Sequence, residues 1–218
     1  MVRINQGSPS ALPRLYLIAD VNSAERLGVD LVDVVSQFVR AGGRMVSLRP
    51  GDVDDRRFLE IGAELAGLLF ASRGVFLVHR RVDLAIVLGA DGVHLPSRGI
   101  DRRELRHLLS DTSLIGRSCH RRSQVEYCDR RNWNFVTLGP FFESISKPGY
   151  GPKLDLDELA KWAPNLDIPV YALGGVVPDK IESCVEAGAA GVAVVGGILG
   201  ADSPFAATRE YLDAIACA

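Results

Sequence analysis

Eight short apolar runs, separated by longer amphipathic stretches, are the feature that most constrains how this chain can fold. Most of the runs lack the alternation of apolar and polar residues found in half-exposed strands, which is typical of parallel strands buried on both faces. The predicted strands cover residues 15–20, 44–49, 75–79, 91–95, 113–118, 135–139, 169–175 and 191–197. The stretches between them predict helices, and the one over residues 29–43 ends on two glycines, a typical helix stop.

Eight strand–helix units in 218 residues favour a (β/α)8 TIM barrel of the α/β class. A doubly wound sheet would also alternate strands and helices, but eight units at this length favour the closed barrel. Three segments repeat the order helix end, glycine, strand and polar exit: AGGRMVSLR, LGADGVHLP and AGAAGVAVVGG. No linker or low-complexity tract divides the chain. We therefore expect a single domain over residues 1–218, with residues 1–14 as a flexible N-terminal arm.

The composition argues against two classes of function. The formal net charge is −2, whereas a nucleic-acid-binding protein usually carries a basic excess on one face. No apolar run reaches the roughly 20 residues that span a bilayer, and the N-terminal segment lacks the apolar core of an export signal. We therefore expect a cytoplasmic protein with no nucleic-acid partner and no membrane partner. A homo-oligomer remains an open expectation.

The cysteines predict neither a disulfide framework nor a zinc site. Cys119, Cys128, Cys184 and Cys217 are scattered along the chain without CxxC spacing, which favours reduced thiols. No cluster of Asp, Glu and His has metal-ligand spacing either. The spacing of these residues therefore predicts no metal ion.

Active sites of TIM barrels lie at the carboxyl ends of the strands and in the loops that follow. The predicted seventh and eighth strands both end on glycine pairs, Gly174–Gly175 and Gly196–Gly197. Glycines let backbone N–H groups approach an anion closely, and a following helix start adds its positive dipole end. The alternative is that the glycines only form tight turns, but two pairs at these two positions favour phosphate binding.

The loop after the predicted sixth strand, residues 140–152, is long for a connection of this kind. It contains the hydroxyls of Ser144, Ser146 and Tyr150 together with Lys147. A mobile loop of this composition could close over a polar substrate, with Lys147 offering a charge to an anion. An ordinary surface loop is the alternative.

Two of the four histidines and one arginine are candidates for chemistry or binding. His120 follows the fifth strand, where an imidazole can exchange protons near neutral pH. His79 ends the third strand and could line the mouth of a pocket, whereas His94 lies inside the fourth strand and His107 on a helix. We expect His94 to pack in the core and His107 to face solvent. Arg49 ends the second strand, where a guanidinium can bind a carboxylate or phosphate. An exposed surface role remains an alternative for both His120 and Arg49.

Several segments together resemble the thiamin phosphate synthase/TenI family of (β/α)8 proteins. They are AGGRMVSLR, VDLAIVLGADGVHLP, IGRSCH, GPFFESISK and YALGGVVPDKIESCVEAGAAGVAVVGGI. The resemblance extends from residue 15 to about residue 199, and the order and spacing of the segments make it specific. It implies one of two activities. The synthase joins hydroxymethylpyrimidine diphosphate to a thiazole phosphate and needs Mg²⁺, whereas the tautomerase moves a proton in a thiazole phosphate carboxylate without metal.

The chain departs from the synthase pattern where that pattern binds metal diphosphate. A Gln-x-Arg-x-Lys run after the second strand is replaced by SLRPG, in which only Arg49 is retained. His79 and Arg80 stand in place of an Asn-Asp pair after the third strand, and Gly99 stands near the position of a second aspartate. Mg²⁺ prefers hard oxygen ligands, and nearby cations oppose its binding. These departures argue against synthase activity.

The same positions resemble the TenI-like tautomerase branch, although the basic pair of that branch after the second strand is reduced to Arg49. The resemblance implies that His120 is the acid/base and that the substrate is a phosphorylated thiazole carboxylate, with no metal or other cofactor. The implied substrate-binding residues are Arg49, Ser118, Ser144, Ser146, Lys147, Gly174, Gly175, Val195 and Gly196, with His79 as a further pocket-lining residue. A divergent thiamin phosphate synthase and a non-catalytic, regulatory binder of thiamin-related phosphates are the alternatives.

Overall fold

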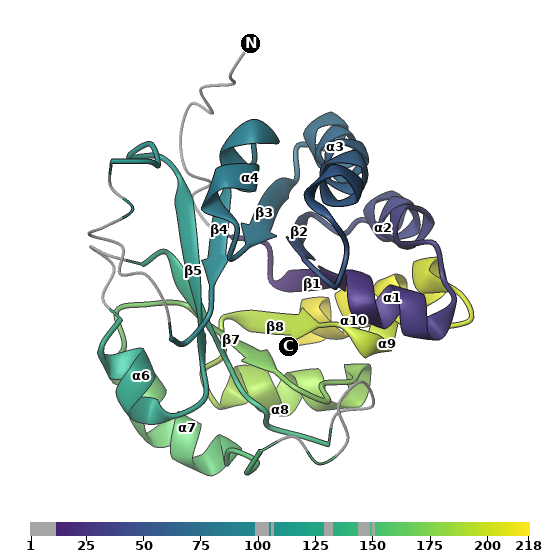
Figure 1. Ribbon diagram of the computed structural model, residues 1–218. Helices are drawn as coiled ribbons and strands as arrows, with labels where there is room; N and C mark the ends of the chain where they lie inside the picture. Colours follow the sequence, from purple (N-terminus) through teal and green to yellow (C-terminus); the bar gives the residue numbers. More distant parts are fainter. Residues whose placement is uncertain (1–11, 99–104, 106, 129–132, 144–148, 150) are drawn as a thin grey trace.

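The computed structural model describes residues 12–98, 105, 107–128, 133–143, 149 and 151–218. Its eight strands are all parallel and close into a barrel in chain order, with β8 paired to β1 (Figure 1). They are β1 (Leu15–Asp20), β2 (Met45–Arg49), β3 (Val75–His79), β4 (Gly92–Leu95), β5 (Leu114–Cys119), β6 (Phe135–Leu138), β7 (Val170–Leu173) and β8 (Gly191–Val194). The predicted TIM barrel is therefore confirmed. β7 and β8 end before the glycine pairs that the sequence pattern had included in them.

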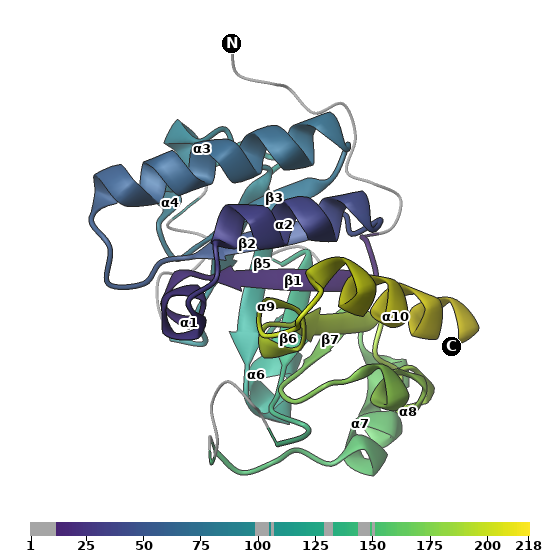
Figure 2. The same ribbon diagram turned by 90° about the vertical axis from the view of Figure 1, so that its right-hand side faces the viewer.

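Helices cover the outside of the barrel. They are α1 (Val21–Leu27), α2 (Leu31–Arg40), α3 (Asp55–Ala71), α4 (Val82–Val87), α6 (Arg122–Glu126), α7 (Leu156–Trp162), α8 (Ile181–Glu186), α9 (Gly196–Leu199) and α10 (Pro204–Cys217), with 3₁₀ turns at Ala163–Asn165 and Pro178–Lys180. Of the helix predicted between the fourth and fifth strands, over residues 101–110, half of the residues lie outside the described ranges. Figure 2 shows α10 beside α2, and both helices contact β1.

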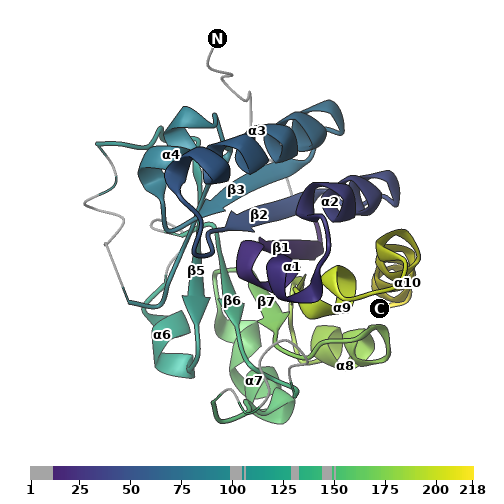
Figure 3. The ribbon, with the colours of Figure 1, turned by 45° about the vertical axis from the view of Figure 1, so that its right-hand side comes forward.

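Two short helices were not predicted from the sequence. α1 begins directly after β1, because the Asp20 carboxylate accepts a hydrogen bond from the Ser23 N–H and caps the helix. α9 begins directly after β8, at Gly196. The two helices are neighbours at one end of the barrel (Figure 3). They extend the polypeptide around the carboxyl ends of β1 and β8, where a site is expected.

The barrel interior changes from apolar to polar along the barrel axis. Near the strand starts it is filled by Tyr16, Phe135 and Tyr171, whose ring centroids lie 5.5–6.1 Å apart in edge-to-face contact. Closer to the carboxyl ends the buried residues include the polar Ser47, His94 and Thr137. The apolar layer therefore closes one end of the barrel, and a polar floor faces the other.

The part of the predicted N-terminal arm that the structure describes contacts the closed end of the barrel. The Tyr171 hydroxyl donates to the Pro13 carbonyl at 2.8 Å, and the Arg14 guanidinium donates to the Ile215 carbonyl at 3.0 Å. Residues 1–11 of the arm lie outside the described residues. In the described ranges, we find no helix whose length and apolarity would let it cross a membrane.

Candidate active site

A pocket of about 290 Å³ opens at the carboxyl ends of the strands, the size of a small-molecule site. Nine residues singled out from the sequence line it: Arg49, His79, Ser118, His120, Gly174, Gly175, Val195, Gly196 and Gly197. Ser144, Ser146 and Lys147 lie outside the described residues. The fold thus gathers strand ends from both sides of the barrel around one cavity.

Gly174 and Gly175 form one wall of this pocket in a conformation that favours glycine. Their φ angles are +93° and +64°, in the region that residues with a Cβ rarely adopt. The backbone after β6 packs directly on them, because the Phe142 N–H donates to the Gly174 carbonyl at 3.0 Å. A Cβ on Gly175 would overlap the Glu143 carbonyl oxygen. Glycine is therefore required here both for the chain direction and for close packing.

The start of α9 forms the adjoining wall. The N–H groups of Ile198 and Leu199 donate to the Val195 carbonyl, and the helix starts at Gly196. The first N–H groups of a helix have no acceptor within it, which leaves those of Gly196 and Gly197 for other partners. N–H groups in this position suit an anionic oxygen.

His120 lies at the pocket mouth with an exposed side chain and a defined ring orientation. Its Nδ1 is 3.0 Å from the Gly139 carbonyl oxygen, and its backbone N–H donates to the Gln124 side chain at 2.7 Å. A carbonyl can only accept, so Nδ1 must carry a proton. In the neutral ring, Nε2 then holds the lone pair. In this tautomer, Nε2 is the ring nitrogen that can accept a proton.

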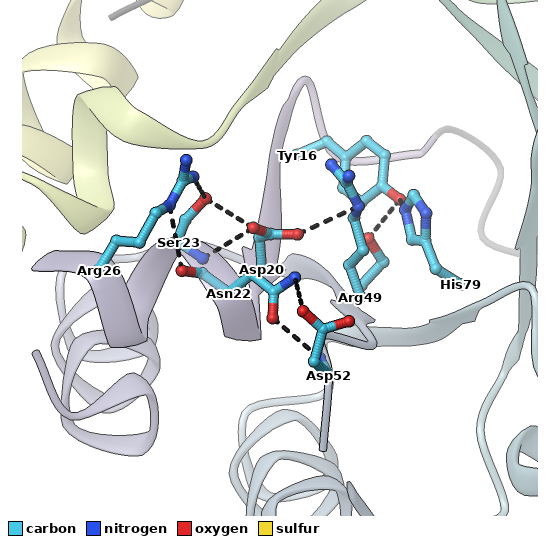
Figure 4. A network of polar contacts seen from close by, with 9 residues as sticks. Tyr16, Asp20, Asn22, Ser23, Arg26, Arg49, Asp52 and His79 are labelled. Carbon is cyan, nitrogen blue, oxygen red and sulfur yellow. Dashed lines mark hydrogen bonds and ion pairs between the residues drawn. The ribbon is translucent and has the colours of Figure 1, made fainter. Parts of the chain in front are cut away.

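Arg49 is held at the pocket by an aspartate to which the sequence analysis gave no role. Its Nε lies 3.1 Å from Oδ2 of Asp20, and the other carboxylate oxygen accepts from the N–H of Ser23 at 2.9 Å and from its hydroxyl at 2.5 Å. Figure 4 shows Asp20 between Ser23 and Arg49. The sequence did contain a signal for this ion pair, because one predicted strand ends in Asp20 and the next ends in Arg49. The pairing was not predicted because the register of β1 and β2 is not visible in the sequence.

The floor of the pocket contains two buried histidines in a hydrogen-bonded network. His94 is fully buried, with Nδ1 3.0 Å from the Tyr16 hydroxyl and Nε2 3.0 Å from the Ser118 hydroxyl. The His79 ring stacks on it with centroids 4.4 Å apart and planes 2° apart. The expectation of a packed, hydrogen-bonded His94 is therefore confirmed. His107 is exposed, as expected.

Both buried imidazoles favour the neutral form. Burial, with the positive charge of Arg49, lowers the pKa of His94 to about 3. Burial also places the pKa of His79 well below its usual value, with His94, Arg49 and Arg80 acting in the same direction. Neither ring can therefore carry a proton as a cation near neutral pH.

The described pocket wall does not fit a magnesium ion. Mg²⁺ needs oxygen ligands, usually including a carboxylate, and no Asp or Glu belongs to the described lining. Asp20 is engaged by Ser23 and Arg49, and both Arg49 and Arg80 line the pocket. Within the described ranges, no three His, Cys, Asp or Glu side chains come together in a group that could hold a metal ion.

The four cysteines are free thiols, and Cys217 is the exposed one. Cys119, next to His120 in the chain, packs into the core, where a hydrogen bond with Cys128 and burial raise the pKa of its thiol. Because the thiolate is the reactive form, Cys119 is unsuited to act as a nucleophile.

The fold and the site define a class: a TIM-barrel protein with a compact pocket at the carboxyl end of the strands, lined by backbone N–H groups and basic side chains. Residues 15–198 match the model of the TMP-TENI family, described as thiamine monophosphate synthase. The chain belongs to this family of thiamine biosynthesis, and the resemblance noted in the sequence is confirmed.

Individual relatives cover nearly the whole chain. A protein of Geobacter sulfurreducens, provisionally named thiamine-phosphate synthase, is 37% identical over 198 residues, which cover 91% of this chain and 92% of the relative. A thiamine-phosphate synthase of Roseiflexus castenholzii is 35% identical and covers 95% of this chain and 90% of its own length. The solved thiamine phosphate pyrophosphorylase of Pyrococcus furiosus superposes with a TM-score of 0.80 at 25% identity, covering 93% of this chain and 95% of that structure. These names agree with the synthase alternative rather than with the tautomerase branch.

Proposed function

We propose that this chain catalyses a metal-free proton shift in a phosphorylated thiazole carboxylate, the reaction of the TenI-like tautomerase branch. The observation that carries the proposal is the orientation of His120, whose Nδ1 proton is directed to the Gly139 carbonyl. The absence of a carboxylate from the described pocket lining supports it.

The reaction needs an anion site, a charge to orient the substrate and one proton carrier. The substrate phosphate would bind the backbone N–H groups of Gly174, Gly175 and Gly196 beside Val195. Arg49 would bind the carboxylate, with Ser118 on the adjoining wall. From the loop after β6, Ser144, Ser146 and Lys147 would close over the substrate.

His120 would perform the proton transfer. Its Nε2 removes a proton from the thiazole ring system, and the resulting imidazolium returns that proton to another position of the conjugated system. The proton removed is the proton returned, so the net change is an isomerisation that needs no oxidant, metal or second substrate. A general acid/base of this kind contributes about 10²–10⁴-fold to the rate.

A divergent thiamin phosphate synthase is the second candidate, and the names of the relatives favour it. It would couple hydroxymethylpyrimidine diphosphate with thiazole phosphate in the same pocket. His79 and Arg80, at the β3 end, are the observation against it, because neither can replace a metal-binding carboxylate.

Two assays on the purified chain distinguish these candidates. We expect the non-aromatic thiazole carboxylate phosphate to isomerise at the same rate with and without a chelator. Formation of thiamin phosphate from the two synthase substrates, abolished by the chelator and without isomerisation, would overturn the proposal in favour of the synthase. Tight binding of thiazole phosphate with neither activity would identify a regulatory binder.

A further inference from the structure

Gln124, on α6, contacts the proposed proton carrier but has no part in the proton shift described above. Its side-chain oxygen Oε1 accepts a hydrogen bond from the His120 backbone N–H at 2.7 Å. The contact joins the start of α6 to the end of β5, and the two elements are neighbours in Figure 3. Gln124 does not belong to the described pocket lining, so it can act on a ligand only through His120.

This hydrogen bond takes the place of the usual cap at a helix start. The residue before α6 is Arg121, whose side chain makes no capping hydrogen bond. A glutamine at the third position of a helix can instead reach back to a backbone N–H at the helix start. Gln124 is the third residue of α6, and it reaches back four positions to His120. One side chain therefore fixes both the start of α6 and the backbone of His120.

Gln124 is itself fixed by its surroundings. The next residue, Val125, is fully buried and anchors α6 in the core. The Gln124 carbonyl accepts from the Cys128 thiol at 3.2 Å, and its N–H donates to the Arg121 carbonyl at 3.0 Å. The side chain is half-buried. Gln124 thus offers His120 an acceptor whose position is defined by the core.

The acceptor of the His120 ring is also fixed. Gly139, whose carbonyl faces Nδ1, follows β6 and donates its own N–H to the Cys119 carbonyl at 3.2 Å. A Cβ on Gly139 would overlap the Leu173 carbonyl oxygen, so the backbones after β6 and β7 pack closely here. His120 is exposed, and an exposed side chain held at one point only would exchange between rotamers. Each rotamer would place Nε2 at a different point of the pocket mouth.

We propose that Gln124 is a positioning residue: by accepting the His120 N–H, it fixes the backbone from which the imidazole reaches the Gly139 carbonyl. The role predicts an effect on the rate of the proton shift and not on substrate affinity, because Gln124 is no part of the described pocket wall. The effect on rate rests on the function proposed above, whereas the effect on the ring does not.

Steady-state kinetics of two Gln124 variants test the effect on rate. Gln124→Met keeps the length and the helix propensity but removes the acceptor. It should lower kcat for isomerisation by about tenfold to 100-fold and leave KM within about twofold, because the proton carrier alone is misplaced. Gln124→Glu keeps an acceptor that can make the same bond and should restore most of kcat.

Gln37→Met is the matched control. Gln37 is also half-buried, and its Oε1 accepts from the Phe205 backbone N–H at 3.3 Å, at the start of α10 and away from the pocket. We expect its kcat to equal that of wild type. A wild-type kcat in Gln124→Met, or an equal loss in Gln37→Met, would overturn the positioning role.

Nitrogen-15 NMR of the His120 ring tests the role without turnover. At about pH 8, where an ordinary imidazole is neutral, wild type and Gln124→Glu should carry the proton on Nδ1. Gln124→Met should show a mixture of the two tautomers, because its ring is released from the Gly139 carbonyl. An unchanged tautomer in a folded Gln124→Met protein would contradict the role.

Amide hydrogen exchange of the wild-type chain needs no variant to fold. The His120 amide should exchange at least about tenfold more slowly than in an unstructured chain, because it donates to Gln124. Exchange at the unstructured rate would refute the proposal. A chain with a protected amide and a Gln124-dependent tautomer but without isomerase activity would refute only the proposed function.

Discussion

At the scale of single residues, the contact between His120 Nδ1 and the Gly139 carbonyl is the one on which the proposed proton shift depends. In the proposed reaction, it would decide which ring nitrogen receives the substrate proton. Asp20 orients Arg49 in a comparable way. It pairs with the guanidinium through Nε, which leaves the two terminal guanidinium nitrogens for a ligand. Both contacts link residues that are distant in the sequence.

Replacing His120 with asparagine should lower the isomerisation kcat by about 10²–10⁴-fold, because the amide cannot take up a proton at neutral pH. KM should change little, since the phosphate and carboxylate sites are retained. Steady-state kinetics with the thiazole tautomer measure both values. His107→Asn, an exposed histidine away from the pocket, is the matched control. Equal rates in wild type and His120→Asn would remove His120 from the mechanism.

Gly175→Ala should abolish tight phosphate binding and destabilise the fold. The positive φ alone costs about 1–2 kcal/mol for a residue with a Cβ, and the overlap with the Glu143 carbonyl displaces the loop after β6. Calorimetric titration with inorganic phosphate and urea unfolding measure the two effects. Gly67→Ala in α3, where a Cβ meets nothing within 4 Å, should instead stabilise by about 1 kcal/mol. Unchanged phosphate affinity in Gly175→Ala would show that this wall does not bind the anion.

At the scale of elements, short segments after the strands build most of the site. Asp20 ends β1, caps α1 and pairs with the last residue of β2, so one carboxylate joins three elements. α9 is only four residues long but turns the chain so that its first N–H groups line the pocket. α1 and α9 both begin within two residues of a strand end, so no turn segment in the sequence marks their starts, and they were not predicted.

Asp20→Ala should destabilise the protein by about 1–3 kcal/mol, because it removes the α1 cap and leaves the buried Ser23 hydroxyl without its acceptor. Asp20→Asn keeps a capping oxygen and should lose less than half as much. Urea unfolding of both variants measures the difference. Asp52→Ala, an exposed carboxylate in the neighbouring loop, serves as the control. An equal decrease in the free energy of unfolding in the two Asp20 variants would mean that the charge of Asp20, rather than its capping oxygen, stabilises the junction of β1 and α1.

At the scale of the whole molecule, barrel closure places polar groups from five strands above an aromatic layer. Tyr16, Ser47, His94, Ser118 and Thr137 come from β1, β2, β4, β5 and β6. They hydrogen-bond His79 and His94, two buried and neutral imidazoles at the floor of the pocket. This polar floor makes the stability of the barrel sensitive to acid.

The free energy of unfolding should fall as the pH drops below about 6.5, the ordinary pKa of histidine. His79 and His94 have lowered pKa values in the folded state, so below this pH the unfolded chain binds more protons than the folded one. Each of these two histidines then lowers the free energy of unfolding by about 1.4 kcal/mol per pH unit. For His94 this decrease continues down to a pH of about 3. Urea unfolding at pH 7 and 5.5 should differ by about 2–3 kcal/mol.

The variant His94→Gln removes one of the two groups and should roughly halve that difference. Carboxylates with lowered pKa values, such as Asp55 and Asp83, lose their contribution only at lower pH and do not interfere at 5.5. An equal free energy of unfolding at pH 7 and 5.5 in the wild type would contradict neutral burial of the histidines.

The sequence by itself determined the barrel and the approximate position of the site. Apolar runs buried on both faces and the spacing of glycines are local properties, so the eight strands and the Gly174–Gly175 and Gly196–Gly197 ends were predictable. Because carboxyl ends of parallel strands meet at one rim, Arg49, His79, Ser118 and His120 could be assigned to one pocket.

Only the tertiary structure decided how these groups are connected. Tyr16 and His94 are 78 positions apart in the chain, and His120 and Gly139 are 19 apart. The partners depend on strand register, strand tilt and barrel closure. Strands buried on both faces lack the alternating pattern that would reveal their register in the sequence. The tautomer of His120, the hydrogen bonds of His94 and the Asp20–Arg49 ion pair therefore follow from packing across the barrel and not from any local segment.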